Sequence, residues 1–229
     1  MTIVSASGDD ASFTQQRIDI DRYDDVYVVG DVHGCPDALE RLLSTLEFGA
    51  KDLAIFVGDL VRKGPDSKAV LDRVKSSPQL QSVRGNNEQK LLDGRAELPA
   101  LDSADREYLE SLPTAISWAD NLVVHGGVDP SRPLLEHSNG DLLTMRSPNG
   151  DGYDGPFWFD EYADGPRVFF GHTVLEEPLE RKWAVGLDTG CVYGGQLTAY
   201  DVHRERFVSV STPEQEARPD EKFVAVGER

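Results

Sequence analysis

The sequence predicts an α/β fold, and three observations support that prediction. First, short apolar runs that end in glycine occur three times, at residues 24–30, 53–58 and 80–85. Second, each run is followed by a segment with helical spacing of apolar residues, at 36–48, 66–77 and from Asn86 onward. Third, the polar residues Asp31, Asp59 and Asn86, which follow these runs, recur at nearly equal intervals of about 30 residues, the length of one βαβ unit. The first half is therefore expected to form βαβ units around a parallel sheet.

The second half has a different pattern. Residues 103–112 have the periodicity of a helix, and short apolar runs separated by turn residues follow. We expect these runs to form antiparallel strands and hairpins, and we expect the Gly/Pro/Asp-rich segment 147–166 to be a loop. The predicted organisation is one catalytic domain, residues 18–212, between loosely ordered tails at 1–17 and 213–229.

Charge is the unusual feature of the composition. Asp and Glu number 41 and Lys and Arg number 23, of which only 7 are lysine, so the formal net charge is −18. A lysine-poor acidic surface is typical of a protein that works in molar salt, where charge repulsion is screened. We therefore predict a halophilic protein; an acidic protein from an ordinary cell is the alternative. The negative charge also argues against binding of duplex nucleic acid, which depends on basic contacts to phosphate.

The compartment is predicted from what the sequence lacks. No apolar stretch reaches the roughly 18–20 residues that a membrane helix needs, and the N-terminal residues do not resemble a secretion signal. Two cysteines, Cys35 and Cys191, cannot form a disulfide framework and are expected to be buried thiols. The prediction is a cytoplasmic protein with no membrane partner.

Side chains that bind metals follow the predicted strands. Because parallel strands place their carboxyl ends at one edge of a sheet, these side chains are expected to converge there. Together they form a nitrogen and oxygen ligand set large enough for two ions that share a carboxylate. The set comprises Asp31, His33, Asp59, Asn86, His125 and His172.

The motifs around these residues resemble those of a known superfamily. GDVHG, GDLVRKGP, GNNE, HGG and GHT, in this order, and also GLDTGCVYGGQLTA, are similar to the calcineurin-like metallophosphoesterases. Within that superfamily, the resemblance is to the branch of phosphoprotein phosphatases and symmetrical diadenosine tetraphosphatases, and it covers about residues 24–210. It implies a double β-sandwich of two mixed sheets flanked by helices, with two divalent metal ions at the sheet ends. Manganese is the expected metal, and iron or zinc also occur in the family.

The resemblance also assigns roles to individual residues. Asp31 and His33 would hold the first ion, and Asp59 would bridge both. The remaining ligands, which would hold the second ion, are Asn86, His125 and His172.

Four further residues receive roles from the same comparison. Lys63 aligns with a phosphate-binding arginine of the family, Arg62 is an additional cation beside it, and Arg146 resembles the second phosphate-contacting arginine. A solvated turn is the alternative for Arg62 and Lys63. Asp188 is expected to orient a ligand imidazole through a hydrogen bond.

Two positions depart from the family pattern. Most relatives have histidine where this chain has Asn87, and protein phosphatases have an aspartate where Arg62 stands. In the family this histidine is thought to protonate the leaving oxygen, and an amide cannot supply a proton near pH 7. We therefore expect good leaving groups, such as a phosphoanhydride or an aryl phosphate, to be preferred over alkyl esters. Loss of activity is the alternative explanation of Asn87.

Taken together, the sequence predicts a metal-dependent hydrolase of phosphoric ester or anhydride bonds. The expected partner is a phosphorylated small molecule or nucleotide, with a dinucleoside polyphosphate as the named candidate. A serine/threonine phosphoprotein phosphatase, which would take a phosphoprotein, is the second possibility. The alternative from another class is a catalytically weak metal-binding module that senses a nucleotide or docks a partner.

Overall fold

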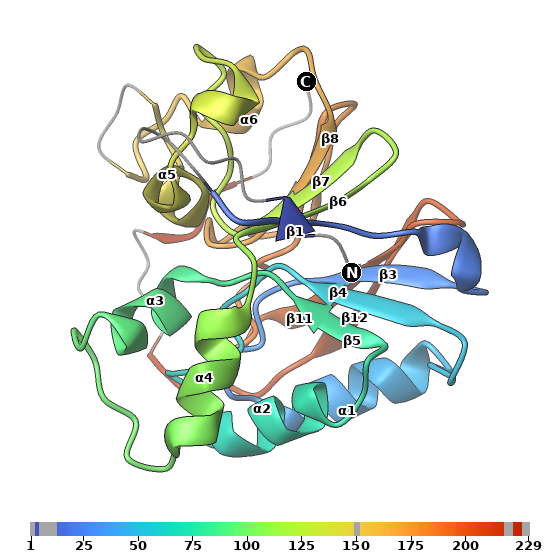
Figure 1. The fold of residues 1–229 in the computed structure, drawn as a ribbon, viewed down its shortest axis with the longest axis vertical. Coiled ribbons are helices and arrows are strands. Elements are labelled where there is room, and N and C mark those ends of the chain that lie inside the picture. The colour runs from blue at the N-terminus through green and yellow to red at the C-terminus, as the bar shows by residue number, and fades with distance from the viewer. Residues whose placement is uncertain (1–2, 5–12, 149–151, 218–221, 226–229) are drawn as a thin grey trace.

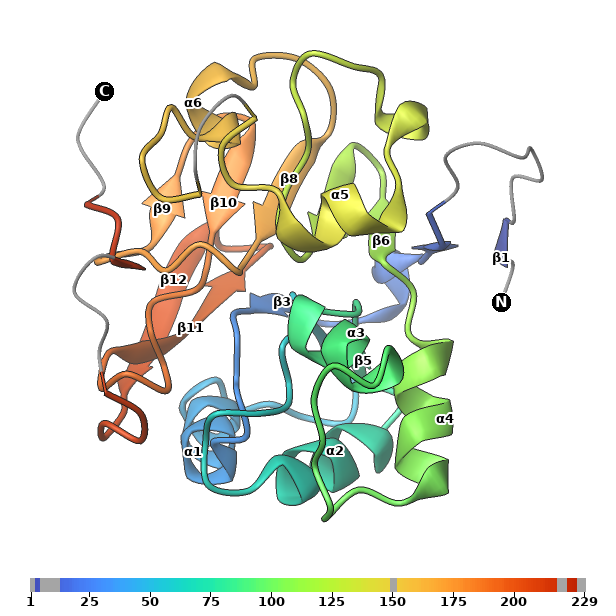
Figure 2. The same ribbon diagram turned by 90° about the vertical axis from the view of Figure 1, so that its left-hand side faces the viewer.

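Two β-sheets pack face to face, and helices cover the outer face of each (Figures 1 and 2). The computed structural model describes residues 3–4, 13–148, 152–217 and 222–225. The predicted architecture of two mixed sheets flanked by helices is confirmed. In the described part of the chain, no helix is both long and apolar enough to cross a membrane.

The five-stranded sheet contains the three predicted βαβ strands. Its order is β12–β11–β3–β4–β5. The strands β3 (Val26–Val29), β4 (Leu53–Phe56) and β5 (Leu80–Ser82) are parallel, as expected. The hairpin of β11 (Gln196–Asp201) and β12 (Arg206–Ser211) is added antiparallel to β3.

The seven-stranded sheet has the order β1–β2–β6–β7–β8–β10–β9. Its strands are β1 (Ile3–Val4), β2 (Gln15–Arg17), β6 (Ala115–Trp118), β7 (Asn121–Val124), β8 (Arg167–Phe170), β9 (Leu179–Glu180) and β10 (Ala184–Gly186). The expectation of antiparallel pairing in the second half of the chain is correct for β6 with β7, β9 with β10 and β11 with β12. It is wrong for β7 with β8 and for β8 with β10. β7, β8 and β10 run parallel to one another, because long connections return the chain to the same end of the sheet before each strand.

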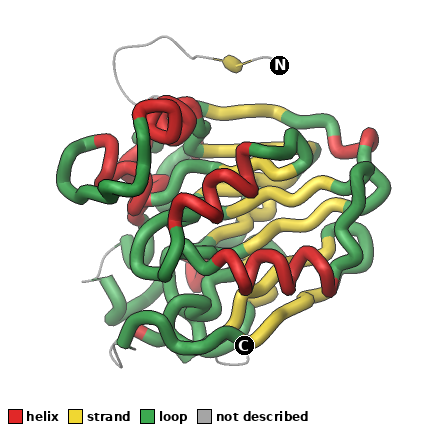
Figure 3. The backbone as a smooth tube through the Cα atoms, turned by 90° about the horizontal axis from the view of Figure 1, so that it is seen from below, coloured by secondary structure: helices red, strands yellow, loops and turns green. Residues whose placement is uncertain are grey.

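Helices α1 and α2 lie across one face of the five-stranded sheet (Figure 3), and α3 begins shortly after the end of β5. The helices are α1 (Pro36–Thr45), α2 (Ser67–Lys75), α3 (Asn86–Leu92), α4 (Ser103–Ser111), α5 (Asn139–Thr144) and α6 (Trp158–Glu161), with 3₁₀ turns at Ile20–Arg22 and Leu134–Glu136. Helix α6 interrupts the segment 147–166, for which a loop was predicted; its aromatic side chains pack into the core.

Strand residues alternate between two cores. In β3, Val26 and Val28 face the layer between the sheets, whereas Tyr27 and Val29 face α1. In β8, Phe169 joins the layer between the sheets and Phe170 joins the outer core beneath α6. This two-residue period allows each sheet to bury both faces, and it makes the strands continuous apolar runs.

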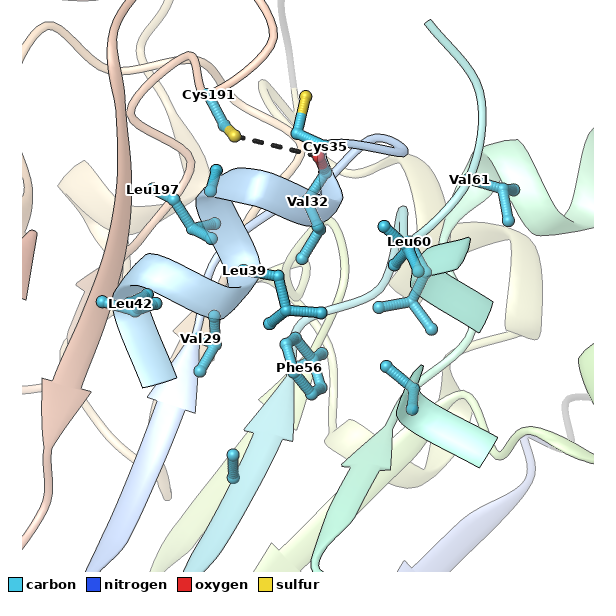
Figure 4. Close-up of a cluster of buried hydrophobic side chains, with 14 of the residues drawn as sticks. Val29, Val32, Cys35, Leu39, Leu42, Phe56, Leu60, Val61, Cys191 and Leu197 are labelled. Atoms are coloured by element: carbon cyan, nitrogen blue, oxygen red, sulfur yellow. Dashed lines mark hydrogen bonds between the residues drawn. The ribbon is translucent and has the colours of Figure 1, made fainter. Parts of the chain in front are cut away.

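The two cysteines belong to the core beneath α1. Cys35 and Cys191 are buried free thiols beside Val32, as predicted, and the Cys191 thiol donates to the Val32 carbonyl (Figure 4).

The ends of the predicted domain remain a prediction. At the N-terminal side, residues 15–17 form β2, which pairs with β6. At the C-terminal side, Glu214 bridges to Tyr193 and Val224 bridges to Leu175. The other parts of the predicted tails, residues 1–2, 5–12, 218–221 and 226–229, lie outside the described residues.

Candidate metal centre

The predicted ligands all follow the carboxyl ends of parallel strands. Asp31 and His33 follow β3, Asp59 follows β4, and Asn86 begins α3 after β5. In the other sheet, His125 follows β7 directly, and His172 follows β8. Because each sheet contributes three parallel strands, their loops meet at one end of the sandwich.

Asp31, His33 and Asp59 form the first group of donors. The His33 Nε2 lies 3.8 Å from Asp31 Oδ2 and 3.8 Å from Asp59 Oδ2. All three side chains are buried. Asp31, Asp59 and His125 each offer one ligand atom, and these three atoms lie within 4.8 Å of one another. A divalent cation fits among these donors, since it would neutralise carboxylates that are buried away from solvent.

Asn86, His125 and His172 form the second group. The Asn86 amide lies 2.9 Å from both His125 Nε2 and His172 Nδ1. The His125 Nδ1 donates to the Val57 carbonyl at 2.8 Å, which directs its Nε2 toward the cluster. Without a cation, the Asn86 Nδ2 satisfies both imidazoles and also Asp59 Oδ2, at 3.2 Å. With a cation, the Asn86 Oδ1 would face the centre instead, so this donor set also fits a metal ion.

Asp59 joins the two groups. Its Oδ1 lies 3.4 Å from His125 Nε2, and its Oδ2 lies 3.8 Å from His33 Nε2. The Asp59 carboxylate therefore directs one oxygen toward an imidazole of the first group and the other oxygen toward an imidazole of the second. This is the arrangement expected of a carboxylate shared by two ions.

The electrostatics of the cluster favour a cation. Burial and the nearby Lys63 ammonium lower the pKa of His33 to about 3, and burial with Arg146 lowers that of His172 well below its usual value. Both imidazoles are therefore neutral at pH 7, the form that binds metals. Burial and the Asp188 carboxylate raise the pKa of Asp31, which reflects crowding of negative charge that a cation would relieve.

The backbone around the cluster is strained. Eight non-glycine residues in the described part of the chain have positive φ, and five of them lie in these loops: His33, Asp59, Arg62, Lys63 and His172. Such conformations cost about 1–3 kcal/mol each and persist where the surroundings impose them. The strain is concentrated where the side chains have to converge.

Gly171 allows one of these loops to approach closely. A Cβ atom at Gly171 would lie 1.9 Å from Asp31 Oδ1. The adjacent His172 N–H contacts the same carboxylate, at 3.3–3.4 Å from its two oxygens. Any larger residue at position 171 would therefore displace Asp31 or the β8 loop.

Glu88 is a structural residue of the site that sequence reasoning missed. It is fully buried in α3, and its carboxylate accepts hydrogen bonds from the backbone N–H groups of Gly85, Asp59 and Val61, at 2.7, 2.9 and 3.2 Å. Burial and the Asp59 charge raise the pKa of Glu88 to about 7. Glu88 thus ties the α3 loop to the Asp59 loop. Its position three residues after Gly85 is the sequence signal, since glutamate there commonly caps a helix.

A pocket of about 420 Å³ opens over the cluster. Of the three cations predicted to contact phosphate, Lys63 and Arg146 line the pocket, whereas Arg62 is not among its lining residues. Lys63 lies over the Tyr193 ring at 5.1 Å, and Arg146 lies over the Tyr153 ring at 4.6 Å. Neither tyrosine was predicted. Trp158 of α6 does not reach this pocket and is buried in the core.

Arg62 and Asn87 contact each other directly. The Arg62 Nη1 donates to Asn87 Oδ1 at 2.5 Å, and Asn87 Nδ2 donates to Asp59 Oδ2. Asn87 also donates its backbone N–H to Asp59 Oδ1, at 2.8 Å. The side chain at position 87 is thus an amide that links a guanidinium to a carboxylate.

Asp188 lines the same pocket, but its contacts differ from the expected ones. Its Oδ1 accepts a hydrogen bond from the Gly190 N–H at 3.1 Å. Among the described residues no imidazole donates to it, so the predicted bond to a ligand histidine is not formed in this structure. Burial raises the pKa of Asp188, and the Lys63 ammonium opposes that shift.

Residues 25–189 match the sequence model of the calcineurin-like phosphoesterases. The chain belongs to the calcineurin-like phosphoesterase family. The resemblance of its motifs to that family is thereby confirmed.

Individual relatives cover most of the chain. The serine/threonine-protein phosphatase 1 of Salmonella typhimurium is 30% identical, over 80% of this chain and 94% of the relative. The asymmetrical bis(5'-nucleosyl)-tetraphosphatase PrpE of Halalkalibacterium halodurans is 30% identical, over 86% of this chain and 96% of the relative. A crystal structure of a protein assigned as a diadenosine tetraphosphatase superposes with a TM-score of 0.78 at 30% identity, covering 88% of this chain and 99% of that one.

These matches extend over whole relatives rather than over a shared fragment. As a calcineurin-like phosphoesterase, the chain is a metal-dependent hydrolase that acts on phosphoric ester or anhydride bonds.

Proposed function

We propose that this chain is a dinuclear metal-dependent hydrolase of phosphoanhydrides or small phosphomonoesters, with a dinucleoside polyphosphate as its candidate substrate. The main support is the convergence of six donor side chains from both sheets beneath one polar pocket. The tetraphosphatases among its relatives support the choice of substrate class.

The donor geometry suggests which residues would hold each ion. Asp31, His33 and Asp59 would bind the first, and Asp59 would be shared with the second. Asn86, His125 and His172 would complete the second site. When bound, two such ions supply a water of lowered pKa and neutralise charge on phosphoryl oxygens. Manganese is the proposed metal, although iron and zinc accept the same nitrogen and oxygen donors.

The cations in the pocket would position the substrate. Lys63 and Arg146 lie over tyrosine rings at its wall and would contact the oxygens of the attacked phosphoryl group. Tyr153 and Tyr193 would offer aromatic faces to a nucleobase or aryl group. Asp188 would hold Lys63 in this orientation by its charge.

Asn87 would make the enzyme selective for good leaving groups. Its amide is held between Arg62 and Asp59 and has no proton to give near pH 7. A phosphate or aryl oxygen departs readily as an anion, whereas a serine oxygen needs a proton. This argument favours an anhydride over a phosphoprotein as substrate.

A phosphoprotein phosphatase is the second candidate, because a serine/threonine-protein phosphatase is among the relatives. The two candidates differ in one measurable way. A phosphatase would turn over a phosphoserine peptide faster than diadenosine tetraphosphate at equal concentration.

The test is hydrolysis of a substrate panel by the manganese-loaded protein. The panel holds an aryl phosphate, diadenosine tetraphosphate, ATP and a phosphoserine peptide. We expect the tetraphosphate and the aryl phosphate to be hydrolysed, and Asp59→Asn to abolish both activities. Two bound ions with no turnover of any substrate would instead establish the catalytically weak binding module.

The assay belongs in molar KCl. We propose a halophilic, cytoplasmic setting, since the net charge of −18 requires screening and both thiols are free. Activity that is higher in 0.1 M than in 2 M KCl would contradict the halophilic part of this proposal.

A further inference from the structure

The lysines of this chain are concentrated at one place. Only 7 occur in 229 residues, and three of them, Lys63, Lys90 and Lys222, line the pocket above the metal cluster. In an acidic protein with few lysines, this gathering indicates a site for a strongly negative ligand.

Four cations in or beside the pocket have no ion-pair partner among the described residues, although the carboxylates of Asp31, Asp59, Asp188 and Glu216 also line the pocket. Elsewhere, Lys51 pairs with Asp24, and both Lys68 and Lys75 pair with Asp105. By contrast, Lys90 has no carboxylate within ion-pair distance among the described residues, and neither do Lys63, Arg62 or Arg146. Positive charge that is left unpaired in a chain with 41 acidic residues is available for an external anion.

Lys90 has a defined position within this group. It lies one helical turn after Asn86 in α3, on the same face, and its Nζ is 2.9 Å from the Asn86 side-chain amide. It is half-buried, and it lines the pocket above the metal cluster. Partial burial of an ammonium group is costly, and an anion beside Lys90 would offset that cost.

The cations fall into two groups. Lys63 and Arg146 lie against Tyr193 and Tyr153. Arg62 reaches Asn87 at the beginning of α3, on the helix that carries Lys90. One phosphoryl group bound to two metal ions has few oxygens left for protein contacts, so a second group of cations implies a second phosphate.

We propose that Lys90, with Arg62 beside it, binds the phosphate next to the one that is attacked, and so selects di- and polyphosphate chains over phosphomonoesters. In hydrolysis, the bond from the attacked phosphorus to the bridging oxygen breaks, and the electron pair stays on that oxygen. Water supplies the new oxygen on phosphorus and releases its proton to solvent. The leaving phosphate departs as an anion, whose charge Lys90 and Arg62 stabilise without donating a proton.

This inference rests on the proposed function, and its test separates the two. Lys90→Gln removes the charge at similar length, Lys90→Arg retains it, and Lys51→Gln is the matched control on an exposed lysine. We would measure binding of inorganic tripolyphosphate and of orthophosphate to the manganese-loaded proteins by calorimetry. Hydrolysis of diadenosine tetraphosphate and of an aryl phosphate would be measured in parallel.

We expect Lys90→Gln to weaken tripolyphosphate binding at least tenfold more than orthophosphate binding. In the same way, kcat/KM for diadenosine tetraphosphate should fall more than kcat/KM for the aryl phosphate. Lys90→Arg should recover most of this loss, and Lys51→Gln should change the binding of neither ligand. The assignment would be overturned if Lys90→Gln weakened the binding of both ligands equally, or if it weakened the binding of neither. If the wild type hydrolyses only the aryl phosphate, the proposed anhydride substrate fails, and tripolyphosphate binding still decides the role of Lys90.

Discussion

Replacing Glu88 by alanine tests how the metal cluster is held in place. The Glu88 carboxylate accepts three backbone hydrogen bonds, from Gly85, Asp59 and Val61. Alanine would leave three buried N–H groups without acceptors, in a position that is fully buried. The change therefore perturbs both the stability of the fold and the position of Asp59.

The expected loss of stability follows from these contacts. A buried donor left without a partner costs about 1–3 kcal/mol, which for three donors gives about 3–9 kcal/mol. The true value should lie near the lower end, because the ionised carboxylate is itself destabilised in the folded protein: burial and the Asp59 charge raise the pKa of Glu88 to about 7. For a chain of this size, about 3 kcal/mol lowers Tm by roughly 6–12 °C.

Thermal unfolding followed by circular dichroism measures this loss. Glu107→Ala, at an exposed helical position, is the control and should unfold like the wild type. Glu88→Gln keeps one acceptor oxygen and should lie between the two. The metal content of Glu88→Ala should also fall, since Asp59 loses its backbone support. A Glu88→Ala protein that unfolds within about 1 °C of the wild type would refute the role assigned to this carboxylate.

Three further predictions concern the same site and the surface. Asn87→His should raise turnover of serine phosphate relative to an aryl phosphate, by up to about 10²–10⁴-fold, the range of general acid catalysis; a rate series over leaving-group pKa measures it, and an unchanged serine phosphate rate would contradict the leaving-group argument. Gly171→Ala should abolish tight manganese binding, because its Cβ would lie 1.9 Å from Asp31 Oδ1; titration calorimetry that shows wild-type affinity would exclude this crowding. Raising KCl from 0.1 to 2 M should raise Tm by several degrees as the net charge of −18 is screened, and a Tm independent of KCl would argue against charge repulsion.

The sequence by itself determined the local elements and the chemistry at their ends. The apolar runs and helical periodicities predicted β3, β4 and β5 and the helices after them, because strand and helix periods are properties of neighbouring residues. The predicted donors Asp31, Asp59 and Asn86 follow from the same pattern, since strand ends in a parallel sheet have to meet. The family motifs added the order of the histidines.

Tertiary structure decided what depends on residues distant in the chain. The parallel pairing of β7, β8 and β10, which brings His125 and His172 to the cluster, depends on long connections that no local period encodes. The contacts of Glu88 with the Asp59 loop, and the position of Lys90 in the pocket above the metal cluster, likewise appear only in the folded chain. The physical reason is that hydrogen bonds and charges act across space, whereas periodicity reports only on neighbours along the chain.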